Sequence, residues 1–159
     1  SSGRRIESVD IKKYLNVLNK KEQSSILKLI DKKLTHIPNC PGLQTYPILH
    51  HHDELKPLIE RLKEYITGNF TVDKCWANHT DGGYINWHLH KSDLSVVYYL
   101  KNKESIGTSF RINDKIVRLK GLQNSLIIFK SEIHSVPLRK KGTPKINRYS
   151  IAFELSLKK

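Results

Sequence analysis

Two histidines separated by a single residue, His88 and His90, are the first feature of the chain that could do chemistry. In a β-strand, residues i and i+2 point to the same face of the sheet, so the two imidazoles would lie side by side. A third histidine, His134, follows the apolar run Ser125–Phe129, at the start of another predicted strand. Three protein ligands on one face of an ion leave its other positions open, as a catalytic metal requires and a structural zinc does not. These histidines therefore predict a catalytic metal site.

Eight short runs rich in β-branched and aromatic residues follow Gly68 and predict the strands that position these side chains. The runs are Phe70–Ala77, Tyr84–His90, Leu94–Leu100, Thr108–Ile112, Lys115–Leu119, Ser125–Phe129, Ile133–Leu138 and Tyr149–Leu155. Turn residues such as Asn113-Asp114 separate many of them, and no helix is predicted between them. An antiparallel sandwich or barrel of the jelly-roll kind is therefore the predicted core.

The N-terminal part of the chain has a helical pattern instead. Between Val9 and Leu34, apolar residues recur every three or four positions, which predicts two short helices broken near Lys20–Ser25. Asp53 predicts the start of a further helix and Gly68 its end. We therefore expect one α+β domain over residues 4–159. Its residues 4–68 are predicted to be mainly helical and to pack on a jelly-roll core over residues 69–157.

The charge balance is the one unusual bulk property. There are 28 Lys and Arg against 15 Asp and Glu, and the formal net charge of +13 favours an acidic or nucleic-acid-containing partner. The basic residues are scattered along the chain, however, as in Lys20-Lys21 and Lys140-Lys141. Apolar runs such as Leu126–Phe129 are far shorter than the roughly 18 residues that indicate a membrane span. The two cysteines, Cys40 and Cys75, make no disulfide framework, so we expect a soluble cytoplasmic protein without a membrane partner.

The histidines lie within a longer ordered series of residues. The series runs through Asn78, Gly82-Gly83, His88 with His90, Leu94–Leu100, Gly107 with Phe110, Gly121, Leu126–Phe129, His134 with Pro137, and Arg148–Phe153. In this order and spacing, roughly from Cys75 to Phe153, the chain resembles the 2-oxoglutarate- and Fe(II)-dependent oxygenases of the prolyl-hydroxylase-like group. The resemblance is greatest to the small bacterial and viral members. It implies a double-stranded β-helix (jelly roll) with N-terminal helices, and an oxidoreductase that uses Fe(II), 2-oxoglutarate and O2.

The motif of that group is His-x-Asp/Glu, a distal His, and an Arg or Lys a short way beyond the distal His. The resemblance implies that His88 and His134 bind iron and that Tyr99 helps to hold 2-oxoglutarate. It also implies that Arg148, fourteen residues past His134, receives the far carboxylate, since arginine offers a bidentate and permanently charged anchor. Asn78 is a further candidate contact for the cosubstrate or the substrate.

The chain departs from the motif at one position, because His90 stands where the motif has a carboxylate. Either three histidines bind the iron, or Asp93 supplies the carboxylate. The same-face rule favours His90, since Asp93 is an odd number of residues away from it. A site of three histidines carries one more positive charge, which is expected to change iron affinity and O2 reactivity.

Three functions follow from these residues. The first is a dioxygenase that hydroxylates a prolyl or other protein side chain, with a nucleic-acid base or small molecule as the alternative substrate. The second is a cupin-like three-histidine metal dioxygenase that uses no 2-oxoglutarate, and so has no role for Arg148. The third is a basic nucleic-acid-binding module, whose binding would depend steeply on salt and not on metal.

Overall fold

The structure is a computed structural model that describes residues 4–5, 11–38, 42–80, 85–88, 91–130, 133–136 and 147–158. Residues 4–5, 85–88 and 133–136 are described by their backbone only. Within these ranges there are two α-helices, α1 (Lys20–Lys33) and α2 (Lys56–Tyr65), and two short 3-10 helices, η1 (Leu49–His51) and η2 (Asp53–Leu55). None of the helices in the described part of the chain has the length and apolar character needed to cross a membrane.

The described strands form two sheets. The larger contains β1 (Arg4–Arg5), β2 (Ile11–Tyr14), β3 (Leu43–Gln44), β4 (Phe70–Thr80), β6 (Leu94–Lys101), β9 (Ser125–Phe129) and β11 (Arg148–Leu157), in the spatial order β1-β2-β9-β6-β11-β4-β3. The smaller contains β5 (Ile85–His88), β7 (Thr108–Ile112), β8 (Lys115–Leu119) and β10 (Ile133–Val136), in the order β5-β10-β7-β8. All pairings between these strands are antiparallel, so the chain has an α+β fold.

All eight predicted strands are present. The bounds of β7, β8 and β9 are those predicted, and β4, β6 and β11 extend one to three residues beyond the predicted ends. The hairpin between β7 and β8 turns at Asn113 and Asp114, whose φ angles of 49° and 63° suit a two-residue turn with positive φ. The predicted ends of β5 and β10, at residues 84, 89–90 and 137–138, lie outside the described residues.

The prediction for the N-terminal segment was wrong in its first half. Ile11–Tyr14 is a strand that pairs with β9, so tertiary pairing overrides the helical spacing of its apolar residues. Helix α1 begins inside the predicted break, because Asn19 and Glu22 form a capping box: the Asn19 Oδ1 accepts from the Glu22 N–H at 2.7 Å, and the Glu22 Oε1 accepts from the Asn19 N–H at 3.0 Å. Asp53 opens η2 rather than the α-helix itself, and α2 ends at Tyr65, before Gly68.

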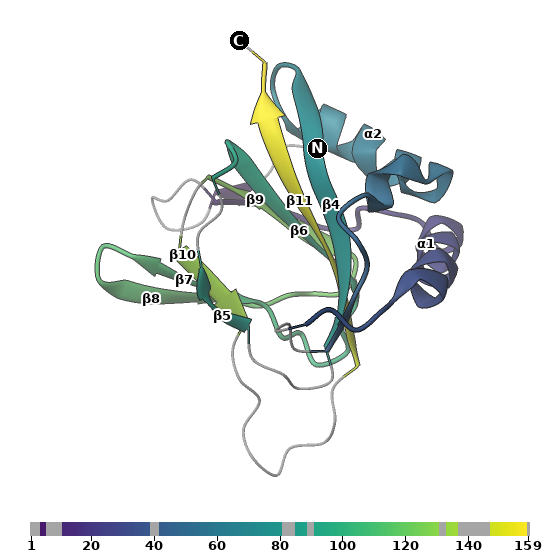
Figure 1. The fold of residues 1–159 in the computed structure, drawn as a ribbon. Coiled ribbons are helices and arrows are strands. Elements are labelled where there is room, and N and C mark those ends of the chain that lie inside the picture. Colours follow the sequence, from purple (N-terminus) through teal and green to yellow (C-terminus); the bar gives the residue numbers. More distant parts are fainter. Residues whose placement is uncertain are drawn as a thin grey trace.

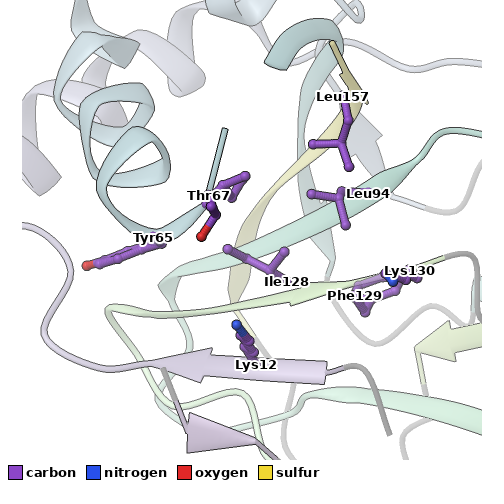
Figure 2. Close-up of a pocket in the computed structure, with 9 residues that line it drawn as sticks. Lys12, Tyr65, Thr67, Leu94, Ile128, Phe129, Lys130 and Leu157 are labelled. Atoms are coloured by element: carbon purple, nitrogen blue, oxygen red, sulfur yellow. The ribbon is translucent and has the colours of Figure 1, made fainter. Parts of the chain in front are cut away.

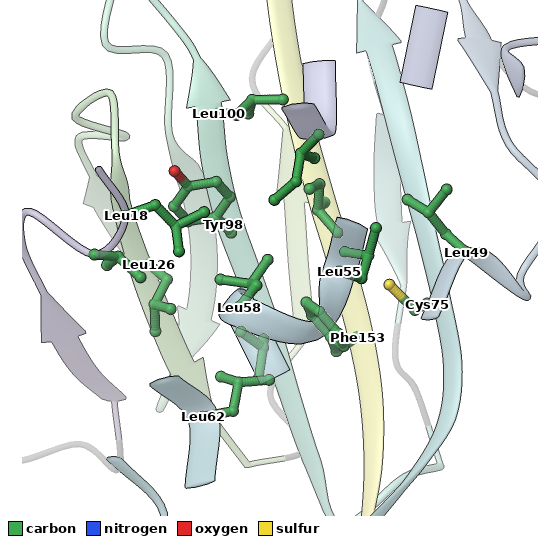
Figure 3. Close-up of a cluster of buried hydrophobic side chains, with 14 of the residues drawn as sticks. Leu18, Leu49, Leu55, Leu58, Leu62, Cys75, Tyr98, Leu100, Leu126 and Phe153 are labelled. Carbon is green, nitrogen blue, oxygen red and sulfur yellow. The ribbon is translucent and has the colours of Figure 1, made fainter. Parts of the chain in front are cut away.

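The elements form three layers (Figure 1). Helices α1 and α2 cover one face of the larger sheet, and the smaller sheet lies on its other side. The main hydrophobic cluster joins the helices to the larger sheet through residues such as Leu58, Leu62, Tyr98 and Phe153 (Figure 3). A smaller cluster of Ile11, Phe110, Ile127 and Phe129 joins the two sheets.

Candidate functional site

Successive side chains along β6 and β11 point to opposite faces of the larger sheet. We call the face that packs on the helices the outer face; it carries Tyr98, Ile151 and Phe153. The inner face is directed toward the smaller sheet and carries Tyr99 and Ser150, which lie opposite each other in register. The candidate site is built on this inner face.

Arg148 begins β11 and is only 1% exposed. Its Nε donates to the Ile106 carbonyl at 2.9 Å, and its Nη1 donates to the Ser150 Oγ at 3.2 Å. Burial lowers the pKa of Arg148, because desolvation disfavours the charged form, but an arginine remains protonated at neutral pH. None of the carboxylates in the described ranges forms an ion pair with it. Arg148 is therefore a buried cation that lacks an acidic counterpart within this part of the chain.

Tyr99 lies beside Arg148, with its ring centre 5.3 Å from the guanidinium carbon. Its side chain is fully buried, and its hydroxyl shares a hydrogen bond of 2.7 Å with the Thr108 Oγ1 of the smaller sheet. Burial raises the pKa of Tyr99, so the phenol is neutral at physiological pH. The chain passes close to this ring at Gly121, where an added Cβ would lie 2.6 Å from the Tyr99 Cε1. Only glycine fits there without displacing Tyr99.

Asn78 completes a row of polar side chains across β4, β11 and β6. It lies opposite Ser150 in register, as Tyr99 does from the other side, so the three residues share the inner face. Asn78 is 8% exposed, and its Oδ1 is buried without a hydrogen-bond partner among the described residues. Buried polar atoms in folded proteins are almost always paired, so an unpaired amide oxygen opposite Ser150, a hydrogen-bond partner of Arg148, indicates a place for a ligand.

The backbone pairing brings two of the three predicted metal ligands together. His88 in β5 lies directly opposite His134 in β10, and His134 lies opposite Phe110 of β7 on its other side. Phe110 is two residues along β7 from Thr108, the hydrogen-bond partner of Tyr99. The topology therefore joins the histidine-bearing strands to the Tyr99 side of the site through β7. His90 lies outside the described residues.

Asp93, the alternative to His90, is held at the other end of β11 from Arg148. Its Oδ2 accepts a hydrogen bond of 2.7 Å from the Leu157 N–H, and its own N–H donates to the Leu155 carbonyl at 3.1 Å. The structure thus does not bring Asp93 and Arg148 together. Among the residues whose side chains are described, no group of three or more His, Cys, Asp or Glu could hold a metal ion, and none of the three predicted histidine ligands belongs to that set.

Sequence reasoning missed three groups at the site. Ser150 and Thr108 are polar residues within buried strands, and such a position, read with the period-2 alternation of each strand, is a signal that could have identified them. The third group is the Ile106 carbonyl, which accepts from Arg148. A main-chain oxygen carries no signature in its side chain, so no sequence signal identifies it.

A separate cavity of about 260 Å³ opens at the edge of the helix-covered side (Figure 2). Its lining comes from β2, β9, the end of α2 and the far ends of β6 and β11, and includes Lys12, Tyr65, Leu94, Ile128 and Leu157. None of the predicted site residues lines it.

The fold is shared with enzymes of known structure. No protein-family model matches the sequence, and no curated protein is detectably similar to it. HygX from Streptomyces hygroscopicus, solved with nickel, 2-oxoglutarate and hygromycin B bound, is similar with a TM-score of 0.71 and 9% identity, over 94% of this chain and 84% of HygX. The collagen prolyl hydroxylase vCPH of Paramecium Bursaria Chlorella virus-1, solved as a 2-oxoglutarate complex, is similar with a TM-score of 0.68 and 12% identity, over 93% of this chain and 96% of the viral protein.

A third similar structure is a prolyl hydroxylase from Trichoplax adhaerens in complex with a peptide of the hypoxia-inducible factor oxygen degradation domain. It has a TM-score of 0.67 and 15% identity, over 94% of this chain and 84% of the enzyme. At identities of 9–15%, the likeness concerns the fold. The resemblance that the residue order indicated is therefore confirmed at the level of the fold.

Proposed function

We propose that this protein is a 2-oxoglutarate- and Fe(II)-dependent dioxygenase. The observation that carries the proposal is Arg148, a buried cation that has no carboxylate partner among the described residues. It lies beside Tyr99, and its hydrogen-bond partner Ser150 is paired in register with Asn78, whose Oδ1 is unpaired within the same ranges. A charge is stable inside a protein only when it is compensated. A bound dicarboxylate supplies the missing negative charge, and 2-oxoglutarate is a dicarboxylate.

The proposed fold is a double-stranded β-helix, or jelly roll, within one domain over residues 4–159. Its support is the strand order: β4, β6, β9 and β11 lie in the larger sheet, and β5, β7, β8 and β10 form the smaller one. Eight antiparallel strands divided in this way between two facing sheets are typical of a jelly roll. The helices of residues 4–68 share one hydrophobic cluster with the strands of residues 69–157, which supports a single domain.

The residues on the inner face have complementary roles toward 2-oxoglutarate. Arg148 donates to the far carboxylate, since its Nε is already occupied by Ile106 and its terminal nitrogens are the groups left to meet a ligand. Tyr99 donates its phenolic proton to the same carboxylate or to Thr108. Asn78 supplies an amide to the cosubstrate or the substrate from the neighbouring strand.

His88, His90 and His134 are the proposed iron ligands, and Asp93 remains the alternative to His90. The direct pairing of His88 with His134 supports a shared ion, because residues opposite each other on antiparallel strands are close neighbours. The hydrogen bond between the Asp93 carboxylate and Leu157 favours His90 as the third ligand. Bound iron would supply O2 activation, with oxidation of 2-oxoglutarate to succinate and CO2 coupled to hydroxylation of a substrate C–H bond.

The proposed substrate is a prolyl or other protein side chain, with a small molecule as the alternative. The two prolyl hydroxylases of similar fold favour the first, and HygX, solved with hygromycin B, represents the second. A cupin-like dioxygenase without 2-oxoglutarate leaves Arg148 with no carboxylate partner within the described ranges, so the buried guanidinium argues against it. The nucleic-acid partner rests on the net charge of +13 and gains no support from the site.

An anaerobic titration tests the proposal. Purified protein is loaded with Fe(II), 2-oxoglutarate is added without oxygen, and the visible absorbance of the iron chelate is followed. We expect a weak charge-transfer band that saturates at one equivalent of 2-oxoglutarate. The variant His134→Ala should lose the band and His36→Ala, a histidine outside the site, should keep it. Absence of the band in the wild-type protein, together with no thermal stabilisation by 2-oxoglutarate, would reject the proposal.

A further inference from the structure

We infer that Asn102 is a positioning residue that fixes the Arg148 guanidinium for the cosubstrate, an inference that rests on the proposed function. Asn102 directly follows β6 and is 1% exposed. The resemblance to oxygenases assigns it no role, and its hydrogen bonds go to main-chain and Gln123 groups. Its connection to Arg148 runs through a shared main-chain oxygen.

The shared oxygen is the carbonyl of Ile106. It accepts from the Arg148 Nε at 2.9 Å and from the Asn102 Nδ2 at 2.7 Å. The same Nδ2 also donates to the Gly121 carbonyl at 2.6 Å. A single amide group thus joins the β6–β7 connection, which carries Ile106, to the β8–β9 connection, which carries Gly121.

Further contacts hold these two connections together. The Gly121 N–H donates to the Ser105 carbonyl at 3.0 Å, and the Asn102 N–H donates to the Gln123 Oε1 at 3.0 Å. A Cβ at Gly107 would overlap the Leu119 carbonyl and lie 2.6 Å from the Gly121 nitrogen, so the two chain segments meet at backbone contact. The Asn102 amide therefore lies where the two connections pack together, and it holds the Ile106 carbonyl in place by a direct hydrogen bond.

This geometry has a consequence for the guanidinium. An arginine has five N–H donors in a planar fork, so fixing the Nε–H direction fixes the plane of the whole group. The Nε of Arg148 is bonded to Ile106 and its Nη1 to Ser150. These two bonds fix one orientation of the guanidinium, in which its remaining N–H groups can donate to a carboxylate. Removing the Asn102 amide releases the Ile106 carbonyl from one of its two donors and leaves the Gly121 carbonyl without that bond. The guanidinium then loses its fixed orientation, and affinity for the far carboxylate falls.

Binding measured by calorimetry on the Mn(II)-loaded protein tests this role, with two probes. 2-Oxoglutarate carries the far carboxylate, whereas oxalate can chelate the metal and has no group that reaches Arg148. We expect Asn102→Ala to weaken 2-oxoglutarate binding about tenfold and to leave oxalate binding within about twofold of wild type, since one lost contact is worth about this factor. A merely structural role for Asn102 would weaken both probes alike or neither.

Asn124→Gly is the matched control. Asn124 is another asparagine that binds main-chain groups, through Leu18, and it also accepts from the Tyr98 hydroxyl on the outer face. Its φ of 62° suits glycine, so the change removes hydrogen bonds without adding backbone strain. We expect it to lower the melting temperature and to leave both affinities unchanged.

The outcomes separate the two proposals. A wild-type protein that binds oxalate but not 2-oxoglutarate would overturn the proposed function, and the inference with it. A wild-type protein that binds 2-oxoglutarate, with Asn102→Ala binding it equally well, would overturn the positioning role and leave the proposed function standing. Equal weakening by Asn102→Ala and Asn124→Gly would also overturn it, because general destabilisation would then explain the loss.

Discussion

The two faces of the larger sheet are built from the same strands but differ in the polarity of their buried side chains. On the outer face, alternate residues of β6, β9 and β11 join the helices in an apolar cluster that includes Tyr98, Leu126 and Phe153. On the inner face, the neighbouring positions carry Tyr99, Ser125 and Ser150, with Arg148 at the start of β11. Both faces are buried. The inner face also carries apolar residues such as Ile127 and Phe129, but around Arg148 its positions are polar, whereas the outer face is apolar.

This difference in polarity suggests that the outer face mainly stabilises the fold and that the polar part of the inner face mainly binds the ligand. Among the described residues, the buried Arg148 has no carboxylate partner and the buried Asn78 Oδ1 has no donor, and both lower the stability of the ligand-free fold. The outer face and the smaller inter-sheet cluster offset that cost. If this division is correct, substitutions on the outer face will change unfolding, and substitutions on the inner face will change ligand binding.

The largest expected effect is on the outer face. Phe153→Ala should lower the free energy of unfolding by about 3–5 kcal/mol, because it leaves a cavity in the main cluster, where Phe153 is fully buried. Urea unfolding followed by circular dichroism measures the change. The affinity of the folded protein for 2-oxoglutarate should stay within about twofold of wild type. A loss of stability below about 1 kcal/mol would contradict the assignment of stability to this face.

Arg148→Met should have the opposite profile. Binding of 2-oxoglutarate should weaken on the order of 100-fold, since removing one member of a buried charge pair costs several kcal/mol. The free energy of unfolding without ligand should change by less than about 1 kcal/mol or rise. The variant replaces a buried charge, unpaired with any carboxylate in the described part of the chain, by an apolar side chain of similar length. Arg118→Met on β8 is the control, since it makes the same change of charge at an exposed position. Strong destabilisation by Arg148→Met with unchanged affinity would assign Arg148 a structural role.

Two adjacent tyrosines, one on each face of the larger sheet, allow the effect of removing a single hydroxyl to be compared between the faces. Tyr99→Phe removes the hydroxyl bonded to Thr108 on the inner face, and Tyr98→Phe removes the hydroxyl that donates to the Asn124 Oδ1 at 2.7 Å toward the outer face. Each should lower the free energy of unfolding by about 1 kcal/mol. Only Tyr99→Phe should weaken 2-oxoglutarate binding, by roughly fivefold, as measured by calorimetry. Equal effects of the two variants on affinity would show that the faces are not functionally distinct.

The smallest effect concerns a hydrogen bond between the start of β11 and helix α1. The Tyr149 hydroxyl donates to the Asp31 Oδ1 at 2.8 Å, and burial, together with the bond to Asp31 and its charge, raises the pKa of Tyr149 from 10.0 to about 12. Because the folded-state pKa is the higher one, the bond stabilises the fold below about pH 10 and this contribution is lost as the pH rises toward 12.

Tyr149→Phe should therefore be about 1 kcal/mol less stable than wild type at pH 8, and this difference should shrink at pH 11. Urea unfolding of both proteins at the two pH values measures it, and the variant corrects for titration elsewhere. A difference that is the same at both values would contradict the role of the Tyr149–Asp31 bond. Binding of 2-oxoglutarate at pH 8 should be unaffected.

Much of the fold could be predicted from the sequence, because each strand has its own local signal. The runs Thr108–Ile112, Lys115–Leu119 and Ser125–Phe129 coincide with β7, β8 and β9, since β-branched residues between turn residues determine them locally. The strand Ile11–Tyr14 could not be predicted in this way. Its conformation depends on pairing with β9, more than a hundred residues away in the chain, and its own residue spacing indicates a helix.

The same distinction, between features with a local sequence signal and features that depend on tertiary contacts, applies to the candidate site. Arg148, Tyr99 and Asn78 were predicted as cosubstrate contacts, the first two from the resemblance to a family motif. The described structure places them on one face of the larger sheet, and their roles toward 2-oxoglutarate stay a prediction. The Ile106 carbonyl and its link to Asn102 could not be identified, because they depend on the contact of two connections that only the tertiary structure brings together. The iron ligands stay a prediction, supported by the pairing of His88 with His134.

The most direct test of the central claim is a crystal structure with Mn(II) and N-oxalylglycine, a mimic of 2-oxoglutarate, with anomalous data collected for manganese. The account predicts one anomalous peak bound by His88, His134 and a third ligand from His90 or Asp93. It also predicts that the far carboxylate of the mimic is paired with Arg148 on the inner face. A peak away from these histidines, or a mimic that does not contact Arg148, would contradict the account.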